Sequence, residues 1–348
     1  MMTDLDVAVI GAGFAGLAAL HLLRERGLQV RAFDEAGNVG GTWWWHAYPG
    51  SHLDTDGPFY QYCFSEQLYR DRGWNGRCAS MLGAMQVSTL TRYPVKSMLG
   101  QQVEEAVVGP TGLERDRWRA LMDPATGYVC TAKHPRLWRR LLKYRAAAHE
   151  EHVLVTTPDG ETLDADDPRL VETLSTDLGR AVEIRAQRPP SSSVERPDPE
   201  EVLAQGVEAE VEAPTLEISQ GTAGDTFVDH SPVHLITTAT LDRLGVEALR
   251  YRPNLVIAAD VAPFAENDWL GRELTVGDVV LRLTLPTPRC SVPTLEHGDL
   301  PRNPDALRPL LTGNRVEVPG FGVLPCAGAY AEVVRPGTVR AGDEVRGA

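Results

Sequence analysis

The chain of 348 residues lacks a surplus of positive charge. Its 34 Lys and Arg residues stand against 48 Asp and Glu residues, a formal net charge of −14. Such a surface repels phosphate backbones, so we expect no nucleic-acid partner. The chain also lacks the run of about 20 apolar residues that a membrane helix needs. Its first residues, MMTDLD, are acidic where a secretion signal would be basic. We therefore expect a cytoplasmic protein without a membrane partner.

Paired cysteines are missing as well. The chain has five cysteines, an odd number, and no two of them form a CxxC pair. This pattern argues against a disulfide scaffold and against a zinc ribbon. A four-cysteine ferredoxin pattern is also absent, so the sequence predicts no iron–sulfur domain. The length allows two or three domains, and a hydrophobic content of 43% allows a sizeable core.

The first 34 residues have the pattern of a dinucleotide-binding turn. Residues 7–10 are a short apolar run, residues 17–26 favour a helix, and residues 29–33 form a second apolar run. Glycines between the first run and the helix allow a pyrophosphate to approach the backbone, and an acid after the second run can hold a ribose hydroxyl. The residues in these roles are Gly11, Gly13, Gly16 and Asp34.

The stretch NVGGTWWWHAYPGSHLDTDGPFYQYCFSEQL, residues 38–68, resembles the flavin-binding start of Baeyer–Villiger and related class B flavin monooxygenases. The matching residues are Gly40, Gly41, Thr42, Trp43, Tyr48, Pro49, Gly50 and Asp54. In that family such residues line FAD, so the resemblance implies an FAD-like role for Gly41, Thr42, Trp43 and Asp54. It stops near Tyr69, and no second GxGxxG follows for NADPH. FAD is therefore a doubtful cofactor, and a flavin monooxygenase fragment or fusion is an alternative function.

Composition divides the whole chain into segments. Residues 1–69 are predicted to be a partial Rossmann-like fragment and residues 70–86 a junction. Short β-like runs separated by Gly and Pro turns predict a small β-barrel domain over 87–190 and a second β-rich domain over 226–348. Residues 191–225 are rich in Pro and Glu, which predicts a flexible insertion or linker. The expected fold is mainly β with some helices, preceded by a partial βαβ fragment.

Turn and cap residues place several elements in the β-rich part. The sequence HVLVTTPDGETL predicts a hairpin about residues 158–160. Asp167, Pro168 and Gly179 are an N-cap, a first-turn proline and a terminating glycine, and so predict one helix. Further along, the pattern predicts a strand over 233–237, a helix over 240–249 and a strand over 254–259.

Seven short motifs in order make the segment 87–345 similar to MOSC proteins, in which a MOSC N-terminal β-barrel domain precedes the MOSC domain. This group includes the mitochondrial amidoxime reducing component and bacterial relatives. The motifs are Tyr93-Pro94-Val95-Lys96-Ser97, Arg115-Asp116-Arg117-Trp118, Thr131-Ala132-Lys133, His230-Ser231-Pro232, Arg252-Pro253-Asn254, Arg289-Cys290 and Pro336-Gly337-Thr338.

The resemblance implies the molybdenum cofactor, a pterin dithiolene with a phosphate. One protein cysteine would add a third sulfur to molybdenum, a metal that favours soft thiolates. Cys290 matches that cysteine, which would be both metal ligand and catalytic residue, and neighbouring Arg289 favours its thiolate. Lys133 and His134 are placed outside the site, and Cys130 and Cys326 are interpreted as structural. The implied cofactor holders are Lys96, Ser97, Arg117, Ser231, Arg252, Asn254, Arg289 and Tyr330.

The implied activity is that of a molybdenum-dependent oxidoreductase. It would reduce small N-oxygenated compounds, such as N-hydroxylated amidines, with electrons from a separate flavin reductase or ferredoxin. An alternative function involves no redox chemistry. In that case the protein would be a carrier of the molybdenum cofactor or of sulfur that uses Cys290.

Overall fold

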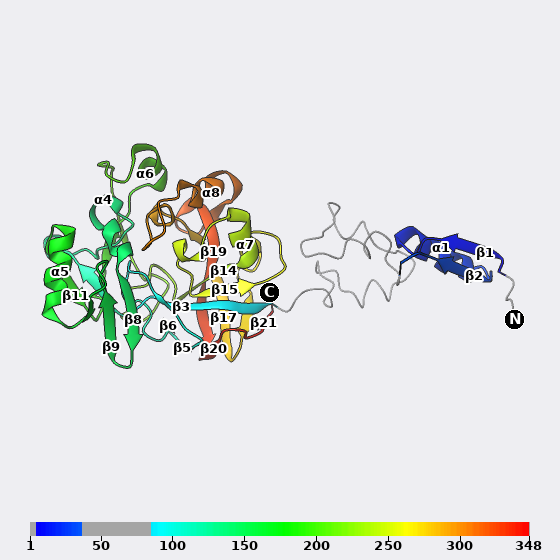
Figure 1. Cartoon of the computed structure of the whole chain (residues 1–348), viewed down its shortest axis with the longest axis horizontal. Coiled ribbons are helices and arrows are strands. Elements are labelled where there is room, and N and C mark those ends of the chain that lie inside the picture. Colours follow the sequence, from blue (N-terminus) through cyan, green and yellow to red (C-terminus); the bar gives the residue numbers. More distant parts are fainter. Residues whose placement is uncertain (1–4, 37–84, 348) are drawn as a thin grey trace. The chain divides into compact units, whose positions relative to one another are not determined.

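The computed structural model describes residues 5–36 and 85–347. The chain divides into two compact units, residues 1–82 and 83–348, which are described separately (Figure 1). The prediction of a mainly β fold with some helices, preceded by a Rossmann-like fragment, is confirmed. Among the described residues, no helix combines the length and the apolar character needed to span a membrane.

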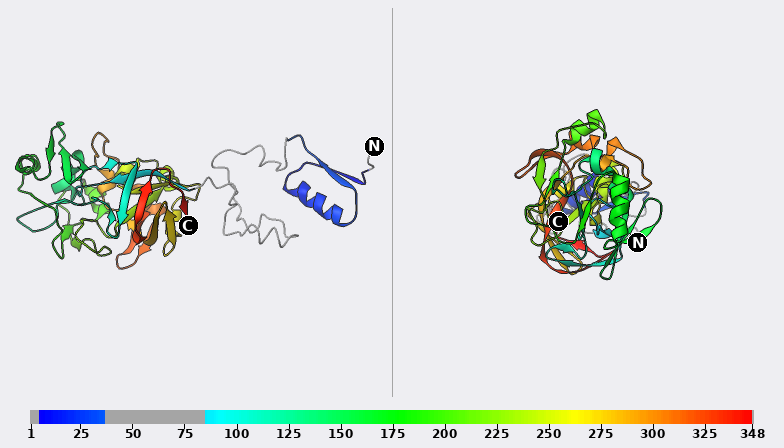
Figure 2. Two further views of the ribbon diagram at one scale, coloured as in Figure 1. Left: turned by 90° about the horizontal axis from the view of Figure 1, so that it is seen from below. Right: turned by 90° about the vertical axis from the view of Figure 1, so that its left-hand side faces the viewer.

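The first unit contains the expected strand, turn, helix and strand. Strand β1 (Val7–Ile10) pairs in parallel with β2 (Val30–Phe33), and helix α1 (Phe14–Glu25) packs against them (Figure 2). A Cβ on Gly16 would lie 1.9 Å from the carbonyl oxygen of Gly11, so the turn requires glycine at residue 16. The sequence therefore determines this turn sterically.

Asp34 lies where the sequence places it, and its carboxylate contacts the glycine-rich turn. It accepts hydrogen bonds from the backbone N–H groups of Ala12 and Ala36, which lower its pKa. The other flavin-like residues, Gly41, Thr42, Trp43 and Asp54, lie outside the described residues, as does most of the predicted junction.

The second unit is organised around a nine-stranded sheet. All of its pairs are antiparallel except the parallel pair in the centre, β14 with β15. Its strands lie in the order β21 (Val345–Arg346), β16 (Glu273–Val276), β17 (Val279–Pro288), β19 (Gly322–Arg335), β14 (Val233–Thr237), β15 (Leu255–Ala258), β3 (Gln86–Arg92) and β4 (Gln101–Gln102), and β18 (Arg315–Val318) pairs with β19.

Both faces of this sheet are covered. Consecutive residues of β14 point to opposite faces, so Leu235 joins the main core with Trp269 and Leu283, while Ile236 packs with Leu244 and Leu310 under helices α7 and α8. Because both faces are covered, all five residues of β14 are buried instead of alternating between buried and exposed. The helical elements of this part of the chain are α7 (Thr238–Leu244), η3 (Ala248–Arg250), η4 (Ala265–Asn267), η5 (Val292–Thr294), η6 (Pro304–Ala306) and α8 (Arg308–Gly313).

Smaller sheets complete the unit. Helix α5 packs its Leu170 and Leu174 on the apolar face of the β8–β10 sheet. Strand β20 pairs with β5, so the last part of the chain adds a strand to a sheet that begins before residue 110. The elements are β5 (Glu105–Gly109), β6 (Gly112–Leu113), β7 (Ala120–Met122), β8 (Arg145–His149), β9 (His152–Thr156), β10 (Thr162–Asp164), β11 (Glu183–Arg185) and β20 (Gly337–Arg340), with α4 (Pro135–Trp138), η2 (Arg139–Lys143) and α5 (Pro168–Leu178).

Several predicted elements are confirmed. Strands β9 and β10 form the expected hairpin, and β14 spans the predicted residues. Helix α5 has Asp167 as its N-cap and ends at Gly179, whose φ is +67°. The helix predicted over 240–249 is too long, because α7 ends at Gly245 in the left-handed conformation and a separate short turn, η3, follows.

The prediction of a flexible insertion over residues 191–225 is corrected by the structure, which has ordered elements there. Residues 193–217, called the strap below, contain β12 (Ser193–Glu195), α6 (Pro199–Gln205) and β13 (Thr215–Glu217), and β12 pairs with β13. Val194 is buried together with Ile218 and Phe227, and Val202 packs near Val292. The polar composition misled the prediction because a few apolar residues suffice to attach the segment to the core.

The main core yields the first testable prediction. Val279 on β17 is fully buried, whereas Val323 on β19 is 56% exposed. Val279→Ala should lower the unfolding free energy by about 2 kcal/mol through lost burial and a cavity. The matched variant Val323→Ala should change it by less than about 0.5 kcal/mol. Hydrogen exchange of the β14 amides in the full chain measures both, and equal effects would contradict the assigned core.

Candidate cofactor pocket

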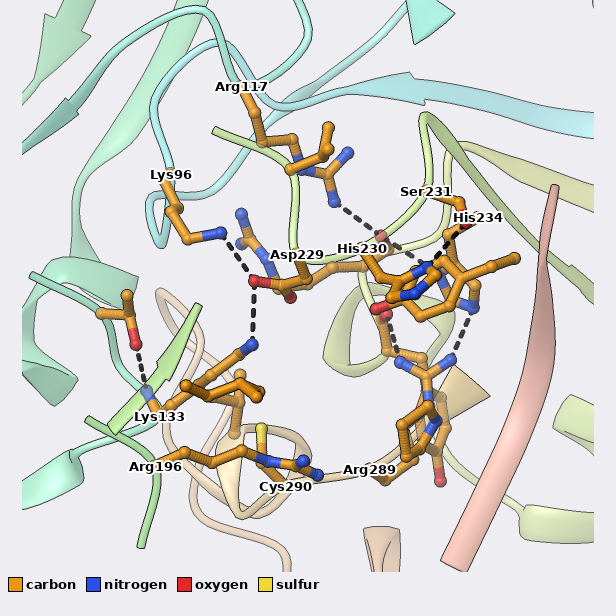
Figure 3. Close-up of a pocket in the computed structure, with 18 of the residues that line it drawn as sticks. Lys96, Arg117, Lys133, Arg196, Asp229, His230, Ser231, His234, Arg289 and Cys290 are labelled. Atoms are coloured by element: carbon orange, nitrogen blue, oxygen red, sulfur yellow. Dashed lines mark hydrogen bonds and ion pairs between the residues drawn. The ribbon is translucent and has the colours of Figure 1, made fainter. Parts of the chain in front are cut away.

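One pocket of the second unit collects all of the residues predicted to hold the molybdenum cofactor (Figure 3). They come from the loops after β3 and β6, from the segments before β14 and β15, from the end of β17 and from the middle of β19, so segments far apart in sequence converge. The pocket encloses about 1190 Å³ of space when its open mouth is included. The predicted residues that line it are Lys96, Ser97, Arg117, Ser231, Arg252, Asn254, Arg289, Cys290 and Tyr330.

Two arginines share one aromatic ring in this pocket. The guanidinium carbons of Arg117 and Arg252 lie 4.5 and 4.3 Å from the centre of the Tyr93 ring. Arg117 forms an ion pair with Asp116 at 2.5 Å, but Nη1 of Arg252 is buried and has no hydrogen-bond partner among the described residues. Burial and the charge of Arg117 lower the pKa of Arg252 to about 10. An unpaired buried donor of this kind is suited to an anionic ligand.

The backbone is strained at three of the predicted holders. Ser97, Arg117 and Arg252 have φ values of 66°, 47° and 55°, in the left-handed region that residues with a Cβ seldom adopt. Each such residue costs about 1–3 kcal/mol, and strain of this kind clusters where ligands bind. The hydroxyl of Ser97 accepts a hydrogen bond from the backbone N–H of Ala132 at 3.1 Å, which holds the two loops together.

A carboxylate shared by two lysines forms a second part of the pocket. Asp229 Oδ1 lies 2.6 Å from Nζ of Lys96 and 2.8 Å from Nζ of Lys133. Burial raises the pKa of Asp229, but the two ammonium groups outweigh it and hold that pKa well below its usual range. Burial lowers the pKa of Lys96 to about 8, although Asp229 opposes the shift.

The placement of Lys133 outside the site was wrong. The lysine lines the pocket because its ammonium group reaches the shared carboxylate of Asp229. Nδ1 of His134, which follows it, instead lies 3.0 Å from Oε2 of Glu195 in the strap, within hydrogen-bond distance. Of these two adjacent residues, Lys133 thus faces the pocket and His134 faces the strap.

Cys290 is a partly buried free thiol at the pocket wall, directly after β17. The neighbouring guanidinium of Arg289 is buried and fully engaged by the protein. Its Nε donates to Ala327 O and its Nη1 to Tyr251 O, each at 3.0 Å, and Nη2 lies 2.5 Å from Nε2 of His234. Arg289 therefore fixes the loop that carries Cys290.

Asn254 has a similar supporting geometry. Its side-chain oxygen accepts a hydrogen bond from the backbone N–H of His234 at 3.1 Å, and its amide nitrogen donates to Thr91 O at 3.2 Å. The amide group joins β14 to β3 and so positions the loop that carries Arg252. The sequence identified a pocket residue, but its polar atoms are directed to the backbone.

An aromatic wall faces the charged residues. The ring of His230 stacks on that of Tyr330, with centres 5.8 Å apart, and Phe321 meets His230 edge-on. Nδ1 of His230 lies 2.9 Å from the hydroxyl of Ser231, and burial lowers the pKa of the imidazole. Burial also raises the pKa of Tyr330. A flat wall of this kind suits a planar ring system.

Sequence reasoning missed four residues of the site and misplaced a fifth, Lys133. Tyr93 and His230 lie inside motifs that were quoted, and Asp229 directly precedes one, so motif position was the available signal for these three. Arg196 of the strap had no signal, because its segment was interpreted as a linker. The residues that were missed or misplaced are Tyr93, Lys133, Arg196, Asp229 and His230.

Known families match three parts of the chain. Residues 84–183 match the MOSC N-terminal beta barrel domain, residues 224–346 match the MOSC domain, and residues 9–67 match the NAD(P)-binding Rossmann-like domain. The second unit thus contains a MOSC N-terminal beta barrel domain and a MOSC domain. The chain as a whole carries this MOSC pair behind a Rossmann-like segment whose relatives are Baeyer–Villiger and other FAD-binding monooxygenases.

Those relatives cover the N-terminal segment alone. Acetone monooxygenase (methyl acetate-forming) from Gordonia sp. (strain TY-5) is 56% identical over 75 residues, which are 22% of this chain and 14% of the relative. A Baeyer-Villiger monooxygenase from Pseudooceanicola batsensis is 53% identical over 75 residues, 21% of this chain and 14% of the relative. The chain therefore spans about one seventh of the length of these curated relatives.

Two solved structures are also similar. The YUAD protein from Bacillus subtilis is 10% identical, with a TM-score of 0.33, and the match covers 76% of this chain and 95% of that one. An oxidized steroid monooxygenase bound to NADP is 48% identical, with a TM-score of 0.20, over 21% of this chain and 14% of that one.

The family matches indicate function in outline. The MOSC domain suggests a function of the sulfurase or reductase kind that involves the molybdenum cofactor. The MOSC and monooxygenase-like segments together suggest an oxidoreductase.

Lys96 makes anion binding dependent on pH. Because burial lowers its pKa to about 8, the side chain is charged below that pH and neutral above it. Sulfate, whose charge is constant in this range, should bind the cofactor-free protein more weakly as the pH rises from 7 to 9. Isothermal titration calorimetry measures the affinity. Lys96→Gln should bind sulfate weakly at both pH values, whereas Lys143→Gln, an exposed control, should keep the wild-type profile.

Proposed function

We propose that the second unit binds the molybdenum cofactor in this pocket and reduces N-oxygenated compounds. The observation that carries the proposal is the buried, unpartnered Nη1 of Arg252 on the ring of Tyr93. It supplies an anion-binding donor in a pocket that also contains the free thiol of Cys290. The pocket is open to solvent and is lined by both polar and apolar residues, as ligand-binding clefts commonly are.

The donor set fits the group. Arg252 and Arg117 would hold the phosphate, the stacked rings of His230 and Tyr330 would face the planar pterin, and Cys290 would supply a soft thiolate. When bound, the cofactor supplies a metal that exchanges electrons in pairs. The protein's own contribution is to fix these groups: Arg289 anchors the Cys290 loop, and Asp229 lies between two lysines and offsets their mutual repulsion.

The overall reaction balances with an external donor. An N-hydroxylated amidine takes up two electrons and two protons, its N–O bond breaks, and the products are the amidine and water. The electrons would come from a separate flavin reductase or ferredoxin. FAD binding by the first unit stays a prediction, because the flavin-like residues after Asp34 lie outside the described part of the chain.

A second candidate function is a carrier of the cofactor or of sulfur. It is favoured by the thiol of Cys290, which is free and partly exposed in the pocket. In this function the protein would hold a persulfide on Cys290 and would show no reductase activity with any electron donor.

Cys290→Ser tests the proposed ligand. The full chain, purified from a host that makes the cofactor, should contain about one molybdenum per chain by elemental analysis and should reduce an aromatic amidoxime. The variant should lose at least about 100-fold in rate, because the thiolate ligand is gone. Cys130→Ala, which removes a buried thiol outside the pocket, is the control. Full activity of Cys290→Ser would contradict the assignment, and a persulfide on wild-type Cys290 without reductase activity would favour the carrier.

Arg252→Gln tests the role of the buried, unpartnered guanidinium directly. Removing the unpartnered guanidinium should lower the amount of cofactor retained after gel filtration by at least about tenfold, because the phosphate loses a charge-assisted donor. Arg282→Gln removes an exposed arginine of β17 and should leave retention unchanged. Pterin fluorescence after oxidative release measures the content. Equal retention by wild type and Arg252→Gln would show that the phosphate lies elsewhere.

A further inference from the structure

The strap forms a wall of the pocket with its own side chains. Arg196, Leu216 and Glu217 line the cavity from this segment. The strap is attached at separate points: Glu195 pairs with His134 at 3.0 Å, and Glu200 pairs with Arg315 at 2.7 Å. These contacts, with the buried strap valines, make the wall a fixed part of the site.

Arg196 is unusual among the cations of the pocket. It is partly exposed, and in the described part of the chain its side chain has no hydrogen bond or ion pair. Among the described residues, the guanidinium of Arg252 also has no hydrogen bond or ion pair, but it is buried on the Tyr93 ring, and the other cations are engaged by the protein. Their partners are Asp229 for Lys96 and Lys133, Asp116 for Arg117, Glu247 for Arg250, and Ala327, Tyr251 and His234 for Arg289.

The guanidinium of Arg196 is directed into the pocket. Figure 3 shows its side chain running toward Cys290, at the edge of the drawn pocket opposite Arg117. Its charge also acts on Tyr330, another residue that lines the pocket, where it opposes the rise in pKa that burial causes. A substrate that reaches Cys290 would therefore meet a free cation beside it.

We propose that Arg196 selects N-oxygenated substrates that carry a carboxylate. The inference rests on the proposed function and names its substrate class. A guanidinium binds a carboxylate through two parallel N–H···O bonds, which gives both strength and orientation. A chain with a net charge of −14 repels small anions in general, so their binding needs a local cation of this kind.

The cofactor's own phosphate is the other anion that Arg196 could meet. The geometry favours the substrate, because Arg196 is partly exposed and lies on the Cys290 side. The buried and unpartnered donor, Arg252, instead shares the Tyr93 ring with Arg117. The two sources differ in what Arg196→Gln removes: substrate preference in one case, cofactor content in the other.

The experiment compares two amidoximes on the full-length, cofactor-loaded protein. One is an aromatic amidoxime with a para-carboxylate, and the other is its neutral methyl ester. Arg196→Gln should lower kcat/KM for the carboxylate by about 10- to 100-fold, mainly through KM, and should change the ester by less than about twofold. Arg136→Gln is the matched control, because it removes an exposed arginine that pairs with Glu210 of the strap outside the pocket. Molybdenum content should be equal in all three proteins.

A binding measurement separates this inference from the proposed function. Equilibrium dialysis of the carboxylated amidoxime, without an electron donor, should show at least tenfold weaker binding to Arg196→Gln than to Arg136→Gln. If no amidoxime is reduced by the wild type, the proposed function fails while this binding difference still tests Arg196. Equal binding by both variants, equal losses with both amidoximes, or loss of molybdenum from Arg196→Gln alone would overturn the inference.

Discussion

The buried guanidinium of Arg289 is the interaction on which the pocket depends. It joins the end of β17 to Ala327 on β19, to the loop at Tyr251 and to His234 on β14. A buried charge is costly unless hydrogen bonds satisfy it, and here carbonyl and imidazole acceptors do so instead of a carboxylate. The side chain therefore fixes four segments together, keeps its positive charge, and holds the Cys290 loop at the pocket wall.

The other charges of the pocket are balanced unevenly. Asp229 satisfies two lysines, and Asp116 satisfies Arg117, so most cations are positioned by the protein alone. Arg252 and Arg196 keep unsatisfied donors, one buried on the Tyr93 ring and one partly exposed on the strap. In the function that we propose, Arg252 would bind the phosphate of the cofactor and Arg196 would bind the substrate.

The first unit and the strap differ in how well their sequences predict their structure. In the first unit, a glycine turn with no room for a side chain at residue 16 makes the local structure readable from the sequence. In the strap, proline and glutamate conceal Val194 and Val202, which are buried in the fold. A few apolar residues decide whether a polar segment packs against the core or remains in solvent, and the average composition of the segment does not reveal them.

The sequence by itself determined the elements with strong local causes, such as α5 with its Asp167 cap and terminal Gly179. The resemblance to MOSC proteins also identified nine of the residues that line the pocket, and all of them except Tyr330 lie within the ordered motifs. Only the tertiary structure decided that Lys133 and Lys96 pair with the same carboxylate, Asp229. It also decided that the side-chain amide of Asn254 hydrogen-bonds to the backbone and that Arg196 lines the cavity. The physical reason is that hydrogen-bond and ion-pair partners are set by long-range contacts, as between Lys96 and Asp229, which no local pattern encodes.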